Sequence, residues 1–318
     1  MVTLSREGKL GRIVELRERI RSLLPEIQTC ELNGLLAQVL HEQLQARETM
    51  ADATTRLWRS RYVRIPVSVR EFVNGKPYLN LPNGQSGADP KIMEALEHLF
   101  DGPYTDVLLA GSIGWSKSTF GTLAVCYDLY RLSCLEDPAT TYGMKIGSNI
   151  TFVNVSVDKR QAERAFFTDL YNMIKSSWYF NHVFKYDKSS KTEIRFPKNI
   201  QCYPVAASER AILGVNVFGA FIDQVNRMHV IERSKRATPG ATTTYNQAEV
   251  LFNGLRARMR SRMNLHGRLP GHLYAASSAL GPDDFTERLI EEAHKELEAN
   301  ETRKPEERRG PYTLILTA

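Results

Sequence analysis

The sequence has 318 residues with a formal net charge of +6, and its hydrophobic and charged fractions of 42% and 25% exclude a disordered or fibrous chain. No apolar run approaches the length of a membrane span, and the N-terminus lacks the apolar core of a signal peptide. The four cysteines form no C-x-x-C pair, so we predict neither a zinc site nor a disulfide framework and expect a reducing, cytoplasmic setting.

The N-terminal part of the chain reads as two amphipathic helices, at residues 9–28 and 34–48. Apolar residues such as Leu16 and Ile20 recur on one stripe of the first helix. We expect residues 1–60 to form a helical arm ahead of the main domain. Simple packing against that domain is the favoured role, and coupling to a neighbouring subunit is the alternative.

The rest of the chain alternates between expected strands and helices. Residues 62–80 alternate in strand fashion around an Asn74-Gly75 hairpin signal, and a short helix follows near residues 91–100. Further strands are expected at residues 106–110, 150–157, 193–196, 200–205, 215–222, 272–276 and 312–316, the last without a partner. Helices are expected between them, at residues 117–130, 158–174, 246–263 and 283–299. This repeated alternation predicts a mostly parallel sheet flanked by helices.

A phosphate-binding loop is indicated by residues 107–119, where an apolar run breaks into a glycine-containing turn and delivers Lys117, Ser118 and Thr119 at a helix start. Backbone N–H groups and the helix N-terminus together favour an anion there. The expected ATP contacts are Gly111, Ser112, Gly114, Trp115, Ser116, Lys117, Ser118 and Thr119. Lys117 would reach the phosphates and Ser118 would bind Mg²⁺. Ser116 replaces the second glycine of the pattern G-x-x-x-x-G-K-S/T, and a plain strand–helix connection is the alternative.

A second apolar strand ends in an acid that could bind the metal ion of such a site. Residues 217–222 are apolar and lead into Asp223, at the edge where an open parallel sheet binds nucleotides. The next residue is Gln224, where many ATPases of this kind have a glutamate that polarises the attacking water. A glutamine can orient water but cannot take its proton.

Taken in order, these blocks resemble the ATPase domain of the large terminase subunit, the DNA-packaging motor of tailed bacteriophages. The resemblance covers roughly residues 100–295 and includes 150–174 with Gln161-Ala162, 208–214 and 274–285. It implies an α/β P-loop NTPase of the ASCE, RecA-like class with a mostly parallel sheet and an N-terminal helical arm. The implied division is an arm at 1–60, an ATPase core at 61–300 and, at 301–318, a linker or the start of a missing C-terminal nuclease domain.

The resemblance also implies roles for single residues, with ATP and Mg²⁺ as cofactors. The implied catalytic set is Asp223, Gln224, Arg210, Ser277 and Ser278. Ser118 and Asp223 would hold Mg²⁺, and Ser277 with Ser278 would sense the γ-phosphate and couple hydrolysis to movement. Arg210 would enter the neighbouring subunit's site, with a surface arginine as the alternative.

Gln224 stands in the place of the family's catalytic glutamate. We read it as a substitution that traps the chain before hydrolysis, with a natural water-orienting glutamine as the alternative. The implied partners are double-stranded DNA, the portal protein, the small terminase subunit and copies of the chain in a ring, a pentamer on the procapsid in the host cytoplasm. A helicase-like ATPase and a nucleotide-binding scaffold that does not hydrolyse are the competing functions.

A basic cluster fits a DNA motor. Its expected DNA-contacting residues are Arg233, Lys235, Arg236, Arg256, Arg258, Arg260 and Arg262. The four arginines after residue 255 lie on the helix expected at residues 246–263, beside a buried stripe of Leu251, Leu255 and Met259. Sequence-independent contact with phosphates needs such exposed charges, and a solvated basic face is the alternative.

Overall fold

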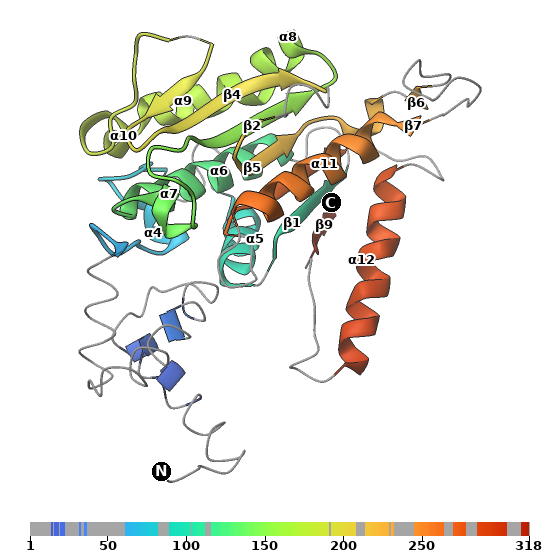
Figure 1. Ribbon diagram of the computed structural model, residues 1–318, viewed down its shortest axis with the longest axis horizontal. Helices are drawn as coiled ribbons and strands as arrows, with labels where there is room; N and C mark the ends of the chain where they lie inside the picture. Colours follow the sequence, from blue (N-terminus) through green and yellow to red (C-terminus); the bar gives the residue numbers. More distant parts are fainter. Residues whose placement is uncertain are drawn as a thin grey trace.

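The computed structural model describes residues 61–81, 89–102, 104–111, 116–190, 192–207, 214–228, 230–231, 245–263, 270–277, 285–303 and 313–317, and single residues or pairs of residues between 14 and 36. A seven-stranded sheet lies at its centre, in the order β3-β4-β2-β5-β8-β1-β9 (Figure 1). The strands are β1 (Asp106–Ala110), β2 (Ile150–Ser156), β3 (Ile194–Phe196), β4 (Ile200–Ala206), β5 (Val217–Ile222), β8 (Leu273–Ser277) and β9 (Thr313–Thr317).

Every neighbouring pair in this sheet is parallel except β3 with β4. The mostly parallel sheet predicted from the strand–helix alternation is therefore confirmed. The carboxyl ends of the parallel strands meet at one edge, where ligands bind in open α/β sheets. Strand β8 separates β1 from β5, so the phosphate-loop strand and the acid-ending strand are not neighbours.

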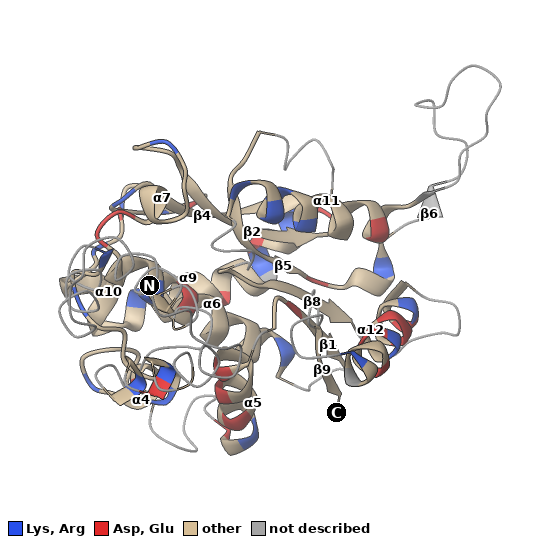
Figure 2. Ribbon diagram, turned by 60° about the horizontal axis from the view of Figure 1, so that its bottom comes forward, with Lys and Arg blue, Asp and Glu red and all other residues tan. Residues whose placement is uncertain are grey.

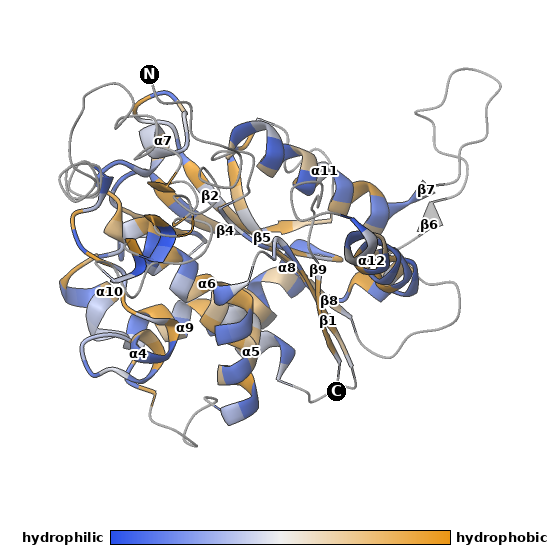
Figure 3. Ribbon diagram, turned by 90° about the horizontal axis from the view of Figure 1, so that it is seen from below, coloured by the Kyte–Doolittle hydropathy of each residue, from blue (hydrophilic) through white to orange (hydrophobic). Residues whose placement is uncertain are grey.

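Helices cover both faces of the sheet (Figure 1). One face carries α4 (Val69–Asn74), α5 (Pro90–Asp101), α6 (Lys117–Cys134), α9 (Thr168–Ser176) and α10 (Trp178–His182). The other face carries α11 (Gln247–Arg262) and the start of α12 (Phe285–Thr302). The short elements are α7 (Pro138–Thr141), α8 (Lys159–Ala162), η1 (Glu163–Phe167), η3 (Val225–Arg227), and the separate pair β6 (Val230–Ile231) with β7 (Tyr245–Asn246). Figure 3 shows hydrophobic strands in the middle and a largely hydrophilic α12.

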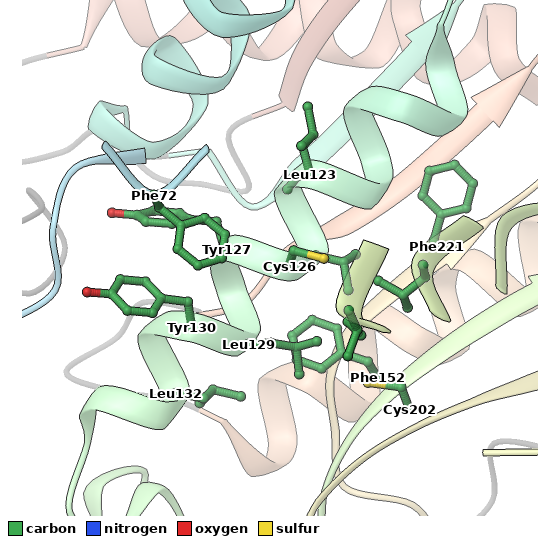
Figure 4. Close-up of a cluster of buried hydrophobic side chains, with 14 of the residues drawn as sticks. Phe72, Leu123, Cys126, Tyr127, Leu129, Tyr130, Leu132, Phe152, Cys202 and Phe221 are labelled. Atoms are coloured by element: carbon green, nitrogen blue, oxygen red, sulfur yellow. The ribbon is translucent and has the colours of Figure 1, made fainter. Parts of the chain in front are cut away.

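Helix α6 is buried along almost its whole length, because it lies between the sheet and the smaller helices. In Figure 4 its side chains point both ways, with Tyr127 and Tyr130 beside Phe72 of α4, and Cys126 toward Phe152 of β2. The Phe72 and Tyr130 rings stack with centroids 4.7 Å apart. A helix that is apolar all round is expected only in such a position.

One polar group interrupts this core. Asp128 of α6 is fully buried, and its Oδ2 lies 2.9 Å from His272 Nδ1 and accepts from the Tyr274 hydroxyl at 3.1 Å. Arg131 Nη1 donates to its other oxygen at 3.4 Å. A buried carboxylate is tolerated when its hydrogen bonds are made, so this group fixes α6 against β8.

Two sequence-based expectations are wrong. Residues 62–80 form no hairpin, because Ser68 caps α4 and Val69, Phe72 and Val73 place an apolar face on the core at helical spacing. The strand near the end of the chain has a partner, since β9 pairs with β1 along its whole length, from Asp106 to Ala110.

The N-terminal arm is described only at scattered positions. Leu16 and Ile20 are helical and fully buried there, as their stripe predicts. Helix Asn246–Met263 is confirmed as α11 with Leu255 and Met259 in the core. Within the described ranges, no helix is both long and apolar enough to cross a membrane. The domain boundaries proposed above stay predictions.

Candidate functional site

The phosphate-binding loop expected from the sequence lies at the carboxyl end of β1 and leads into α6. Lys117 is the first residue of α6, and its Nζ donates to the Gly111 carbonyl at 3.0 Å, across the turn. Ser118 and Thr119 follow in the first helical turn and are half-buried. Ser116 has a φ of 7° rather than the negative value expected for a serine. The lysine and both hydroxyl residues therefore lie at the start of α6, and Lys117 links it to the residue that follows β1.

The acid expected on the metal side interacts with this lysine. Asp223 follows β5 directly, and its backbone N–H donates to the Val155 carbonyl of β2 at 2.8 Å. Burial raises the pKa of Asp223, and the backbone N–H of Gln224 and the ammonium of Lys117 oppose the rise. Burial lowers the pKa of Lys117, and Asp223 opposes that change in turn. Both groups are thus partly desolvated, and the charge of each one offsets part of the pKa shift of the other.

Ser277 ends the strand that runs between these two residues. Its register partner on β1 is Ala110, the last residue before the loop. Ser277 is almost fully buried, and its Oγ accepts from the hydroxyl of Thr286, on the first turn of α12, at 3.2 Å. The serine expected to sense the γ-phosphate is therefore tied to the helix that follows it.

Gln224 adopts a strained backbone conformation next to Asp223. Its φ and ψ of 54° and 50° are left-handed, which costs a residue with a Cβ about 1–2 kcal/mol. Its side-chain Oε1 accepts from Gln161 Nε2 at 2.7 Å. Such strain persists only where the surroundings enforce it, and it is concentrated at functional sites. Gln161, from α8, therefore controls where the amide at the expected catalytic position points.

A π-helical turn, η1, follows the short helix α8 that carries Gln161. The helix expected at 158–174 is present as a continuous helical run, α8, η1 and α9, in which η1 is a π-turn. The ring of Phe166 in η1 stacks on Phe221 of β5 with centroids 3.7 Å apart. Gly121 of α6 lets Phe221 approach, because a Cβ there would lie 2.2 Å from that ring. π-turns inside α-helices are frequent at functional sites, and this one is held against the strand that leads to Gln224.

Helix α11 carries several basic residues (Figure 2), and its arginines divide into an internal one and others at the surface. Arg256 donates to the buried carboxylate of Asp106 at 2.6 Å, and its guanidinium lies over the Phe252 ring. We therefore leave Arg256 out of the DNA-contacting set, because its charge serves this internal ion pair. Arg260 and Arg262 are exposed, and Arg258 is half-exposed.

Several expected site residues lie outside the described ranges. They are Ser112, Gly114, Trp115, Arg210, Ser278, Arg233, Lys235 and Arg236. Their roles stay predictions. Within the described ranges no group of three or more His, Cys, Asp or Glu side chains could hold a metal ion.

A buried strand, a lysine-bearing turn into a helix and an acid two strands away define the α/β P-loop NTPase fold. The chain belongs to the family described as "Uncharacterized protein MJ0330, N-terminal P-loop domain", whose model matches residues 34–298. No curated protein matches the chain.

Bacteriophage proteins are among the solved structures to which this chain is similar. The large terminase of bacteriophage HK97 aligns with a TM-score of 0.50 and 13% identity, over 78% of this chain and 43% of that protein. The large terminase of a thermophilic bacteriophage aligns with a TM-score of 0.43 and 14% identity, over 72% of this chain and 45% of that protein. A mutant of the large terminase ATPase domain of a Thermus phage aligns with a TM-score of 0.42 and 8% identity, over 70% of this chain and 79% of that domain. The chain thus spans less than half of the first two of these proteins, and the HK97 likeness supports a shared fold.

Two residues that contact the site had no role in the sequence-based assignment. Gln161 lies 63 positions from Gln224, and no local pattern links them. Thr286 lies nine positions after Ser277, and the two contact each other only because the start of α12 lies beside the end of β8. For Thr286 the available signal was a polar residue at the apolar start of the helix expected at 283–299. For Gln161 the only signal was its place in residues 150–174, which resemble the large terminase family.

Proposed function

We propose that the chain binds MgATP at this site and is the ATPase part of a viral DNA-packaging motor. The observation that carries the proposal is the position of Lys117, whose Nζ reaches back to the Gly111 carbonyl after β1, while Asp223 follows β5 at the same edge of the sheet. A cation at a loop beside a helix N-terminus matches a polyphosphate, and an acid beside it matches a divalent metal. The P-loop family and the fold shared with the HK97 large terminase support this choice.

The residues present fit a magnesium nucleotide. Ser118 and Asp223 would supply a hydroxyl and a carboxylate, the hard oxygen ligands that Mg²⁺ prefers. A bound Mg²⁺ would neutralise phosphate charge. Lys117 would exchange the Gly111 carbonyl for phosphate oxygens, which are better partners for an ammonium group.

Turnover depends in this proposal on Gln224. A glutamine orients water without accepting its proton, so we infer that the chain hydrolyses slowly and that Gln224→Glu raises the rate by about 10²–10⁴-fold. The second candidate is a nucleotide-binding scaffold that does not hydrolyse. The Gln161 bond favours it, because it takes one of the two acceptor positions on the oxygen with which Gln224 would orient water.

The DNA side of the proposal rests on charge. Arg258, Arg260 and Arg262 would contact phosphates, together with Arg233, Lys235 and Arg236. Arg210 would complete a neighbouring subunit's site in a ring, which we propose as a pentamer on a procapsid. Portal protein and small terminase subunit are the partners that such a ring would have. Ser277 with Ser278 would report the γ-phosphate.

Calorimetric titration with MgATP tests the nucleotide site. Lys117→Ala should weaken binding at least about tenfold, since a hydrogen bond to a charged group contributes about 1.5–3 kcal/mol. Lys91→Ala, at an exposed lysine of α5, is the matched control and should leave the affinity unchanged. Equal affinities for both variants would remove the phosphate-loop assignment. DNA-stimulated ATP hydrolysis by the Gln224→Glu chain would separate the motor from the scaffold.

A further inference from the structure

A basic hollow opens where β2 gives way to α8, beside Gln161. Its volume is about 750 Å³, and we call it the α8 hollow. It is lined by Asp158, Lys159, Arg160, Gln161 and Arg164. Three cationic residues and one carboxylate thus line the hollow, and none of these four has a role in the nucleotide site proposed above.

The positive charge is concentrated on two arginines. Asp158 Oδ1 accepts from the backbone N–H of Gln161 at 2.8 Å, so this carboxylate is engaged at the start of α8. Lys159 lies 3.7 Å from Glu163, which offsets its charge. Arg160 and Arg164 are exposed, and neither has a carboxylate partner among the described residues.

The hollow and the catalytic position share one residue. Gln161 lines the hollow and donates to Gln224. The π-turn η1 lies between Gln161 and the helix α9, and it is packed on β5 through Phe166. A ligand that draws on Arg160 and Arg164 would therefore act on the segment that holds Gln224.

We propose that the α8 hollow binds the phosphodiester backbone of double-stranded DNA and that Gln161 makes the position of Gln224 depend on this binding. The inference rests on the proposed function and adds to it a second contact surface. Two guanidinium groups four residues apart can each bind a phosphate bidentately, without reading sequence. An open, solvent-facing hollow suits a polymer that passes by, and the proposed function assigns the nucleotide to the loop before Lys117.

The test compares two double charge reversals that change the net charge equally. Arg160→Glu with Arg164→Glu alters the hollow, and Lys76→Glu with Lys91→Glu alters exposed lysines near α4 and α5, far from α8 in Figure 1. Binding of a labelled random-sequence duplex of about 30 base pairs is followed by fluorescence anisotropy between about 50 and about 200 mM salt. The hollow variant should bind at least about tenfold more weakly, with a log–log salt slope smaller by about 2. The lysine variant should stay within about threefold of the unaltered chain.

A second readout addresses Gln161. In the Gln224→Glu background, the ratio of ATPase rates with and without DNA should fall in the hollow variant and in Gln161→Ala, but not in the lysine variant. If the unaltered chain binds DNA and both charge reversals bind it equally well, the α8 hollow is not a DNA-binding surface. The proposed motor function would be unaffected by this result. Loss of self-association with unchanged DNA affinity would instead assign the hollow to a protein interface. If the unaltered chain binds no DNA, the motor itself is wrong.

Discussion

The ion pair between Arg256 and Asp106 offers the sharpest test of how the basic helix is held. Asp106 is 1% exposed and is the first residue of β1, while the Arg256 side chain is 19% exposed. Arg256→Met should leave a buried carboxylate without its counter-ion, and breaking such a pair typically costs about 3–5 kcal/mol. Asp106→Asn combined with Arg256→Met should recover most of this loss, because no charge then remains buried.

The loss should depend on pH. Burial raises the pKa of Asp106, and Arg256 opposes the rise, so the arginine's removal should raise this pKa further. The folded Arg256→Met chain would then hold the proton more tightly than the unfolded chain. The destabilisation is therefore largest above the folded pKa and shrinks as the pH falls toward the ordinary range of an aspartic acid.

Urea denaturation followed by circular dichroism, at about pH 8 and about pH 5, measures both effects. Arg262→Met, at an exposed position on the same helix, is the control and should change stability by no more than about 0.5 kcal/mol. If the two variants have the same free energy of unfolding at about pH 8, the internal role of Arg256 is refuted. Arg256 would then again be expected among the DNA-contacting residues.

Three further changes test the packing around the site. Gly121→Ala should lower the melting temperature, because its Cβ would displace the Phe221 ring at a cost of about 1–3 kcal/mol, more than the helix propensity gained. Thr286→Val should reduce the free energy of unfolding in urea by about 1 kcal/mol, because Ser277 loses its buried donor. Gln224→Gly should be more stable than Gln224→Ala by about 1 kcal/mol in the same assay, the reverse of the order inside a helix, because the backbone there is left-handed. Unchanged stability, or the helical order at Gln224, would contradict these interpretations.

The main strands could be predicted because their signals are local. Residues 150–156 and 217–222 are apolar runs, which parallel strands buried on both faces require. The Asn74-Gly75 signal failed for a physical reason: the same residues also end a helix, where Gly75 is the C-cap. The cap at Ser68 and the spacing of its apolar neighbours decided between the two.

The contacts that define the site are not local. Arg256 and Asp106 are 150 positions apart, so a run of arginines on one helix gave no sign that one of them is internal. The π-turn in the helix after β2 contacts Phe221 of β5 through Phe166, and the sequence of that helix does not contain this partner. Lys117 could be predicted because it begins a helix after a glycine-containing loop, and Asp223 because it follows an apolar strand. Gln161 lies inside a helix, where no comparable sequence pattern marks it.

Strand β8 is the element through which the parts of the site meet. It lies between β1 and β5, so a shift of β8 is felt by both the loop and the acid-ending strand. Tyr274 ties it to Asp128 in the helix that begins at Lys117, and Ser277 ties it to α12. From α12, Arg288 reaches Glu249 of α11 at 3.0 Å, on the helix that carries the exposed arginines. A phosphate could only accept from the Ser277 hydroxyl, whereas Thr286 donates to it, so one serine could contact a nucleotide at the loop and α12 at the same time.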